Sequence, residues 1–190
     1  MKSLLRISVL GLFGLAVALL NCKNTGTGPD NSLGNLLANG SFELNGHPTF
    51  GSWALVDTPL DTMTLFKQDV PPFGGSFCLE VTPRPPDANW ARAYATGILA
   101  LGGVFRVTVW ARTTNDWPNG SIAFGKISQG FPTILKSKGT PSPDWTQYTL
   151  EDTLDVSTQD SLFVQLSPGQ ADQIVPGTMR FDLIKLEQLR

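Results

Sequence analysis

The sequence predicts an all-β fold, a sandwich of two sheets. Its apolar runs are short, and clusters of Gly, Pro, Asn and Asp separate them, as in chains built from strands and tight turns. Beyond residue 21, no window carries the apolar stripe of period 3.6 that an amphipathic helix needs. The 19 glycines and 14 prolines provide for many turns, and short strands at this spacing are typical of sandwiches.

The first 21 residues have the pattern of an export signal. Lys2 and Arg6 precede an apolar run over residues 7–20, which is shorter than the roughly 20 apolar residues of a comfortable membrane-spanning helix. The run ends at Cys22 and resembles the lipobox of bacterial lipoproteins, whose cysteine receives lipid and becomes the first residue of the mature chain. Asn21 departs from the small residue usual before that cysteine. A cleaved signal followed by an unmodified cysteine is the alternative.

Residues 22–34 contain Asn, Thr, Gly, Pro and Ser with almost nothing apolar, so we expect a flexible tether. Residues 35–190 then form one domain, long enough for a hydrophobic core. A net charge of −2 gives no basis for binding nucleic acid. If Cys22 carries lipid, Cys78 has no partner and is expected to be a buried thiol. A disulfide between the two is the alternative in an oxidising compartment.

Each predicted strand is an apolar run with turn residues on both sides. The first contains Leu36, Leu37 and Phe42, with a turn signal at Asn39 and Gly40 and an acid, Glu43, directly after the last apolar residue. The others follow at regular spacing to the end of the chain. The predicted strands cover residues 36–43, 52–57, 63–68, 76–82, 89–99, 104–112, 121–128, 132–137, 145–153, 161–167 and 178–188.

Two of these strands alternate clearly between their faces. In residues 104–112, one face is apolar and is expected to meet the core, through Phe105, Val107, Val109 and Ala111. The opposite face carries Arg106, Thr108, Trp110 and Arg112. In residues 89–99, alanines form one side, and the other carries Trp90, Arg92, Tyr94 and Thr96.

Flat rings beside forked donors suit a sugar site, because rings stack on the apolar faces of pyranoses and arginines bind hydroxyls. If the two strands are neighbours in one sheet, these side chains form one groove. The alternative is that a loop or the chain's tail covers this face, so that the aromatic residues belong to the core. Trp53 and Trp145 are assigned to packing.

Four segments in fixed order carry a resemblance to a known family. They are an opening Asn-Gly-x-Phe-Glu at residues 39–43, the strand at residues 105–112, a Trp-x-x-Tyr pattern at residues 145–148, and a closing Phe-Asp pair at residues 181–182. Together they resemble the bacterial carbohydrate-binding modules of families 4, 9 and 22, which are galactose-binding-like β-jelly rolls. Leu183 stands where a second Asp is usual, and Phe105 stands where Tyr is usual. The specificity of the family for particular polysaccharides therefore does not transfer.

The resemblance implies a structural calcium ion. In these modules the opening Glu and the closing-strand Asp hold Ca²⁺ together with backbone carbonyls, and the matching residues here are Glu43 and Asp182. Carbonyls of the turn at residues 74–76, Gly75 among them, are the further expected ligands. Calcium takes six to eight oxygen ligands, so two carboxylates without a local acidic loop are a weak signature on their own.

The sequence carries no activated nucleophile. His47 lies in a turn and is expected to be a solvated loop residue, and the acids are scattered with no pattern that pairs them. The first hypothesis is therefore a membrane-tethered, non-catalytic glycan-binding lipoprotein of the bacterial envelope, anchored at the outer membrane and monomeric. Its expected ligand-binding residues are Trp90, Arg92, Tyr94, Arg106, Trp110, Arg112 and Trp117. The alternative is a protein-binding surface lipoprotein, an adhesin or envelope scaffold on the same fold.

Overall fold

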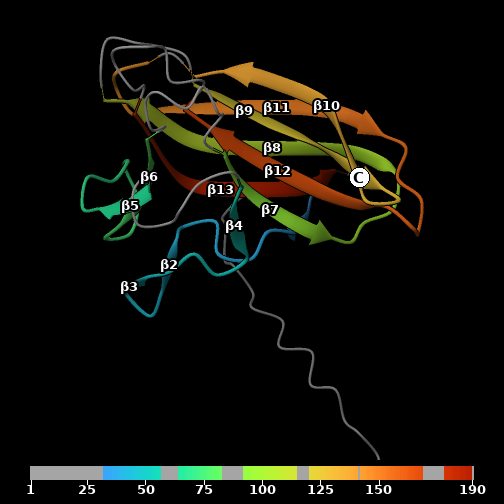
Figure 1. Cartoon of the computed structure of the whole chain (residues 1–190), viewed down its shortest axis with the longest axis horizontal. Helices are drawn as coiled ribbons and strands as arrows, with labels where there is room; N and C mark the ends of the chain where they lie inside the picture. Colours follow the sequence, from blue (N-terminus) through green and yellow to red (C-terminus); the bar gives the residue numbers. More distant parts are fainter. Residues whose placement is uncertain are drawn as a thin grey trace, which may run out of the picture.

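The protein is a sandwich of two antiparallel sheets (Figure 1). The computed structural model describes residues 32–56, 64–82, 92–114, 120–140, 142–168 and 178–189. Within these ranges no helix has the length and hydropathy needed to span a membrane. The predicted fold class, an all-β sandwich, is confirmed.

Six strands form the first sheet. Its order is β11 (Thr146–Leu154), β8 (Gly103–Thr113), β13 (Met179–Leu189), β6 (Cys78–Val81) and β5 (Thr64–Lys67), and β1 (Ser32–Asn35) pairs with β13. Residues 32–34, which the sequence assigns to the tether, are therefore in a strand. Backbone pairing does not require the apolar side chains that a search for hydrophobic runs detects.

Five strands form the second sheet, and a short hairpin stands apart. The sheet order is β10 (Phe131–Gly139), β9 (Ser121–Ser128), β12 (Ser161–Ser167), β7 (Arg92–Ile98) and β4 (Trp53–Val56). The hairpin consists of β2 (Glu43–Leu44) and β3 (His47–Pro48). It lies with β5 at one end of the sandwich, whereas the turn between β7 and β8 lies at the other end (Figure 1).

The core lies between the two sheets, as the alternation predicts. The apolar face of β8 is fully buried, through Phe105, Val107, Val109 and Ala111. Leu162, Val164 and Leu166 of β12 meet it from the other sheet. Removing these side chains from water is the main favourable contribution to folding, about 25 cal/mol for each Å² of apolar surface. Trp53 is also buried, as expected, whereas Trp145 is only partly buried and lies on the outer face of the six-stranded sheet.

The opening stretch is not the predicted strand. Residues 36–42 follow β13 through two backbone bonds, Leu36 N–H to Leu186 at 2.7 Å and Ile184 N–H to Gly40 at 2.8 Å. Asn39 and Phe42 have φ of 57° and 56°, a left-handed conformation outside the extended region that a regular strand requires. The resulting bend buries the Phe42 ring completely, with its centroid 5.3 Å from that of Trp53.

Candidate functional site

The residues expected to form one groove lie in different sheets. Arg92 and Tyr94 belong to β7 in the five-stranded sheet, whereas Arg106, Trp110 and Arg112 belong to β8 in the six-stranded sheet. Both strands turn their small or aliphatic residues toward the shared core, so their polar faces point away from each other. The single groove was therefore wrong: β7 and β8 are consecutive along the chain but cross from one sheet to the other. Trp90 and Trp117 lie outside the described residues.

The outer face of β8 is occupied by ion pairs within the chain. Arg106 Nε lies 3.1 Å from Glu151 Oε2, and Arg112 lies 3.0 Å from Asp69. Asp69 also accepts hydrogen bonds from Arg180 and, at 3.2 Å, from Trp145 Nε1. Two of the arginines expected to bind sugar hydroxyls are thus already paired with carboxylates.

Asp69 is the centre of this network. Burial alone would raise the pKa of Asp69, but the hydrogen bond from Trp145 and the charges of Arg112 and Arg180 together lower it. Arg180 extends the network to Glu80 at 2.8 Å, and Lys67 lies 3.4 Å from Glu80. The network joins four strands and the two loops that carry Asp69 and Trp145. Its role is structural.

The outer face of the five-stranded sheet carries a different arrangement, which we call the Tyr94 cluster: Tyr94, Phe163 and Gln165. The partly buried ring of Tyr94 lies 5.8 Å from the ring of Phe163, centroid to centroid. The Tyr94 hydroxyl donates to Gln165 Oε1 at 2.7 Å. Phe163 and Gln165 are buried, so they fix the ring and the hydroxyl in place.

Sequence reasoning identified Tyr94 but missed its two partners. In β12 the core side is Leu162, Val164 and Leu166, which places Phe163 and Gln165 on the outer side. The same alternation that was applied to residues 104–112 would have found them. Gly125 of β9 makes room beside them, since a Cβ there would lie 2.0 Å from the carbonyl oxygen of Thr133 and 3.0 Å from the Phe163 ring.

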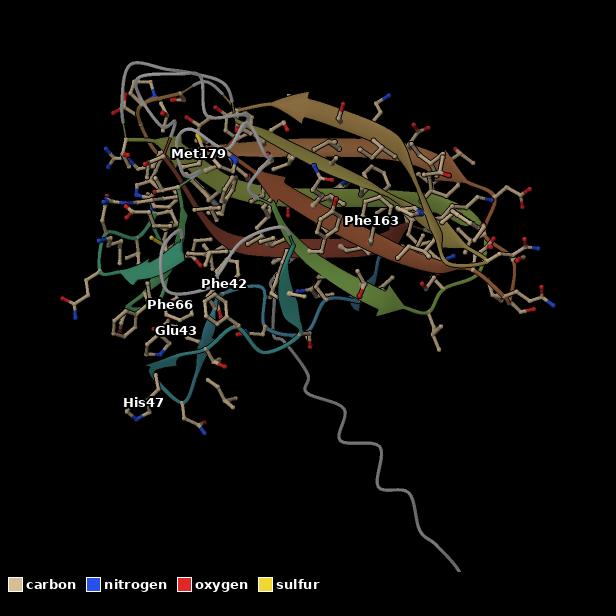
Figure 2. All side chains as sticks on the ribbon, viewed as in Figure 1. Phe42, Glu43, His47, Phe66, Phe163 and Met179 are labelled. Carbon is tan, nitrogen blue, oxygen red and sulfur yellow. The ribbon has the colours of Figure 1, made fainter. Side chains whose placement is uncertain are left out.

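Glu43 and Asp182 meet at the turn of residues 74–76, where the resemblance places them. Ser76 N–H donates to Glu43 Oε1 at 2.8 Å. A Cβ on Gly75 would lie 1.5 Å from Glu43 Oε2, and one on Gly74 would lie 2.8 Å from Asp182 Oδ2. Only glycines allow the turn to pass this close to both carboxylates. Figure 2 shows Glu43 on β2, directly after the buried Phe42.

The backbone is distorted on both sides of this pair. Phe42 precedes Glu43 and has φ of 56°, and Leu183 follows Asp182 and has φ of 49°. At the same place β13 changes register between Asp182 and Lys185, as in a β-bulge. Non-glycine residues in this conformation are uncommon, and they are found where the surrounding structure holds a side chain in a required position.

Asp182 is a fully buried acid with one unsatisfied oxygen. Its Oδ1 accepts from Leu183 N–H at 2.7 Å, whereas its Oδ2 has no hydrogen-bond partner among the described residues. Burial, together with the negative charge of Glu43, raises the pKa of Asp182 to about 7, against the lowering effect of the Leu183 N–H. An unpartnered buried oxygen beside a second carboxylate is what a bound cation would compensate.

The donors around this pair are hard oxygens. No cluster of three or more His, Cys, Asp or Glu residues suited to a metal occurs in the described ranges, so backbone carbonyls would have to complete any coordination shell. Cys78 lies nearby but is a free, buried thiol, as predicted, and its Sγ–H donates to the Asp69 carbonyl at 3.0 Å. Burial, and next the charge of Asp182, raises its pKa to about 12, so it stays protonated.

No family model matches the sequence, and no curated protein matches it either. Solved structures do match, and several of them are carbohydrate-binding modules. A family 16 carbohydrate-binding module is 16% identical, with a TM-score of 0.57 over 80% of this chain and 99% of its own. The CBM22-1 xylan-binding domain of Paenibacillus barcinonensis Xyn10C is 10% identical, with a TM-score of 0.57 over 86% of this chain and 99% of its own.

A third match belongs to a larger protein. The enzymatically active domain of bacteriophage CBA120 tailspike protein 4 is 16% identical, with a TM-score of 0.59 over 82% of this chain, which spans only 21% of the tailspike chain. At these identities the likeness establishes the fold. The chain therefore has the β-jelly-roll fold of the carbohydrate-binding modules, as the four ordered segments imply.

Proposed function

We propose that this chain is a non-catalytic glycan-binding module, carried at a bacterial membrane by lipid on Cys22. The observation that carries the proposal is the Tyr94 cluster on the outer face of the five-stranded sheet. A partly exposed ring that packs against the buried Phe163 ring offers apolar surface to a pyranose. Its hydroxyl oxygen, oriented by the bond that it donates to the buried Gln165, can accept a hydrogen bond from a sugar hydroxyl.

The outer face of the six-stranded sheet is the less favourable location. A ligand there would compete with Glu151 for Arg106 and with Asp69 for Arg112. A guanidinium binds a carboxylate more strongly than a neutral hydroxyl, so these pairs are the favoured partners of both arginines. Trp110 lies on this face opposite Asp182, and we assign it to the surroundings of that acid.

The absence of catalysis is part of the proposal. Glycoside hydrolysis needs two carboxyl groups on either side of an accessible bond. Asp182 is completely buried, and the carboxylates of Asp69, Glu80 and Glu151 are paired with arginines. His47 is exposed in the β2–β3 hairpin, as expected of a solvated loop residue (Figure 2).

A glycan array tests the proposal. The chain starting at residue 23, which lacks the lipid acceptor, should bind one class of polysaccharide on the array, and xylan is a reasonable first member because a module of the same fold is a xylan-binding domain. The Tyr94→Ala variant should lose that signal, whereas Arg106→Ala should keep it. An array without binding, or binding that survives Tyr94→Ala but not Arg106→Ala, would contradict the proposed site.

A protein partner is the second candidate function, and strand β10 is the observation that favours it. β10 is an edge strand in which all nine residues are exposed, among them the apolar Phe131, Ile134 and Leu135. An exposed edge of this kind can accept a further strand from another protein. If this is the function, Ile134→Lys should abolish capture of an envelope protein and leave glycan binding unchanged.

We also propose that Glu43 and Asp182 hold a structural Ca²⁺. The orphaned Asp182 Oδ2, the Gly74 and Gly75 positions that no side chain can occupy, and the hard oxygen donors fit this ion. It would join the hairpin β2–β3, the turn before β6 and the bulge of β13. The ion has a structural role in this proposal and takes no part in binding glycan.

A further inference from the structure

We infer that the turn between β7 and β8 contacts the lipid bilayer to which the chain is anchored. The inference rests on the lipid anchor of the proposed function and adds a second, non-covalent membrane contact. The contacting side chains are Leu99, Leu101 and Val104, which we call the apolar rim. The expected partner is the surface of a phospholipid bilayer.

The apolar rim is exposed where a turn would ordinarily be polar. Leu99 is 78% exposed, Leu101 is 63% exposed and Val104 is 36% exposed. Residues 96–104 contain no charged side chain. A shallow pocket of about 240 Å³ adjoins the rim, and Leu36, Leu37, Ile98 and Leu99 are among its lining residues. Exposed large apolar side chains close together on one turn are a candidate site of interaction with protein or membrane.

Hydrogen bonds to its backbone groups hold the turn in place. Gly102 N–H donates to the Val156 carbonyl at 3.1 Å. The Gln188 side-chain amide donates to the carbonyls of Leu101 and Gly102 at 3.3 and 3.4 Å. These bonds satisfy polar groups that would otherwise oppose transfer into the interfacial region of a bilayer. Because these backbone groups are already bonded, the exposed leucine side chains can enter the bilayer interface with a smaller desolvation penalty.

The apolar rim also lies close to the point where the chain enters the domain. Leu189 of β13 pairs with Ser32 of β1 on one side and with Val104 of β8 on the other. Ser32 and Val104 are therefore two strand spacings apart, about 10 Å. The turn between β7 and β8, which leads into Val104, lies at the end of the sandwich away from β2, β3 and β5 (Figure 1).

Chain length keeps this end near the membrane. Nine residues, 23–31, separate Cys22 from Ser32. Even fully extended, the ten Cα–Cα steps from Cys22 to Ser32 span at most about 36 Å. A lipid on Cys22 therefore holds the apolar rim at a high local concentration relative to the bilayer, so a contact that would be weak for a free protein becomes populated.

Apolar burial, and not charge, is the expected source of the contact. Among the described residues, charged groups close to the turn include Asp155, next to Gly102, and Lys126, which donates to the Asp155 carbonyl and lies 3.6 Å from Asp160. Arg106, two residues from Val104, is paired with Glu151. These groups carry no excess of positive charge that would attract anionic lipid. The contact should therefore form on zwitterionic phosphatidylcholine and persist at high salt.

Fluorescence quenching by lipids tests the inference on the full, lipidated chain. Leu101→Cys introduces a thiol for a bimane label, since Cys22 carries the lipid and Cys78 is buried. The matched control is His47→Cys, an exposed position at the opposite end of the sandwich (Figure 2). In phosphatidylcholine vesicles containing nitroxide-labelled lipid, the label at residue 101 should be quenched several-fold more than the label at residue 47.

The possible results distinguish failure of the bilayer contact from failure of the lipid anchor. Co-flotation with vesicles but equal quenching at both positions would overturn the contact and leave the anchor intact. Failure to float would overturn the anchor and the inference with it. If the label at residue 101 is shielded equally in detergent, a second copy of the chain covers the rim, and the inference is wrong. Hydrogen exchange of the unaltered chain gives an independent reading, because amides of residues 99–104 should exchange more slowly on vesicles than in detergent.

Discussion

At the scale of single residues, Asp182 departs furthest from ordinary behaviour. Its carboxyl group is fully buried, and its pKa is raised from 3.8 to about 7, first by burial and then by the charge of Glu43. A raised pKa means that the folded chain binds this proton more tightly than the unfolded chain does. Without a cation, the contribution of Asp182 to stability should therefore be fully present below about pH 4 and be lost as pH rises through about 7.

The first prediction follows from this sign. Without calcium, the free energy of unfolding should fall by up to roughly 4 kcal/mol between pH 4 and pH 7, since one pKa unit corresponds to about 1.4 kcal/mol. Millimolar Ca²⁺ should restore the loss above pH 7, because it binds the deprotonated pair in the folded state only. Thermal melts in EDTA and in calcium, at each half unit of pH, measure both effects.

Asp182→Asn is the matched control for this prediction. The amide is neutral and similar in shape, so the variant should lose both the fall in stability above pH 4 and the response to calcium. Asp160, whose pKa is lowered to about 2 mainly by hydrogen bonds from Ser128 and Ser157, acts with the opposite sign but only below pH 4. Identical melting curves in EDTA and in calcium would show that no ion binds here.

The second prediction concerns Tyr94. Tyr94→Ala should weaken glycan binding several-fold to tenfold, because stacking of a ring contributes on the order of 1 kcal/mol. Tyr94→Phe keeps the ring but removes the hydrogen bond to Gln165, so it should show a smaller loss. Calorimetric titration with the glycan found on the array measures both.

Arg106→Ala serves as the control for Tyr94. It removes one partly exposed ion pair with Glu151, and such pairs contribute at most about 1 kcal/mol to stability. Its glycan affinity should equal that of the unaltered chain. Wild-type affinity in Tyr94→Ala would exclude the outer face of the five-stranded sheet as the binding site.

At the scale of elements, the join between the opening stretch and β13 determines the position of both carboxylates. Gly40 faces the bulge of β13, and a Cβ at residue 40 would lie 1.9 Å from the Ile184 carbonyl oxygen. Asn35 Oδ1 supports the same join by accepting from the N–H groups of Leu37 and Leu186, each at 3.0 Å. Glu43 can meet Asp182 only if this join is intact.

The third prediction tests the join. Gly40→Ala should lower the free energy of unfolding by about 1–3 kcal/mol, the usual cost of forcing extra atoms into a packed interface. It should also weaken the calcium response, because the clash displaces the segment that carries Glu43. Gly139→Ala is the control: its Cβ would meet nothing closer than 3.8 Å, and its stability should change by less than about 0.5 kcal/mol. Equal melting temperatures for the two variants would refute this account of the join.

The elements show what the sequence can and cannot predict. Strands such as residues 121–128 and 161–167 were predicted with their observed bounds, because their apolar runs end at clear turn residues. The strand at 36–43 was wrong because apolar content does not show the positive φ of Asn39 and Phe42. Alternation also assigned the faces of β8 correctly but gave no information about which sheet each strand joins.

The candidate sites, too, could be predicted from the sequence only in part. Glu43 and Asp182 are 139 positions apart, and only the ordered resemblance brought them together before the structure did. Phe163 and Gln165 lie in β12, which pairs with β7 across the five-stranded sheet. Their proximity to Tyr94 depends on long-range strand pairing, which local patterns do not encode. The ion pairs of Arg106 and Arg112 were missed for the same reason.

At the scale of the whole molecule, the two ends of the sandwich have different proposed roles. The end with the β2–β3 hairpin holds the proposed calcium ion, and the opposite end holds the turn with the apolar rim (Figure 1). Ser32 of β1 is joined to Val104 of this rim through Leu189 of β13. The outer face of the five-stranded sheet lies between the two ends. A bilayer contact through the rim would leave that face accessible to glycans from the side.

The last prediction concerns the anchor that orients the molecule. Expressed in a bacterium with the lipoprotein pathway, the unaltered chain should yield a mature form that begins at Cys22 and carries acyl chains on it, as intact mass measures directly. Cys22→Ala should either retain residues 1–21 or be released from the membrane fraction, because the thiol is the lipid acceptor. Cys78→Ala, which alters only the buried thiol, should remain lipidated and membrane-bound. A mature chain that starts elsewhere and carries no lipid would refute the anchor, and the domain would then meet its ligand as a free protein.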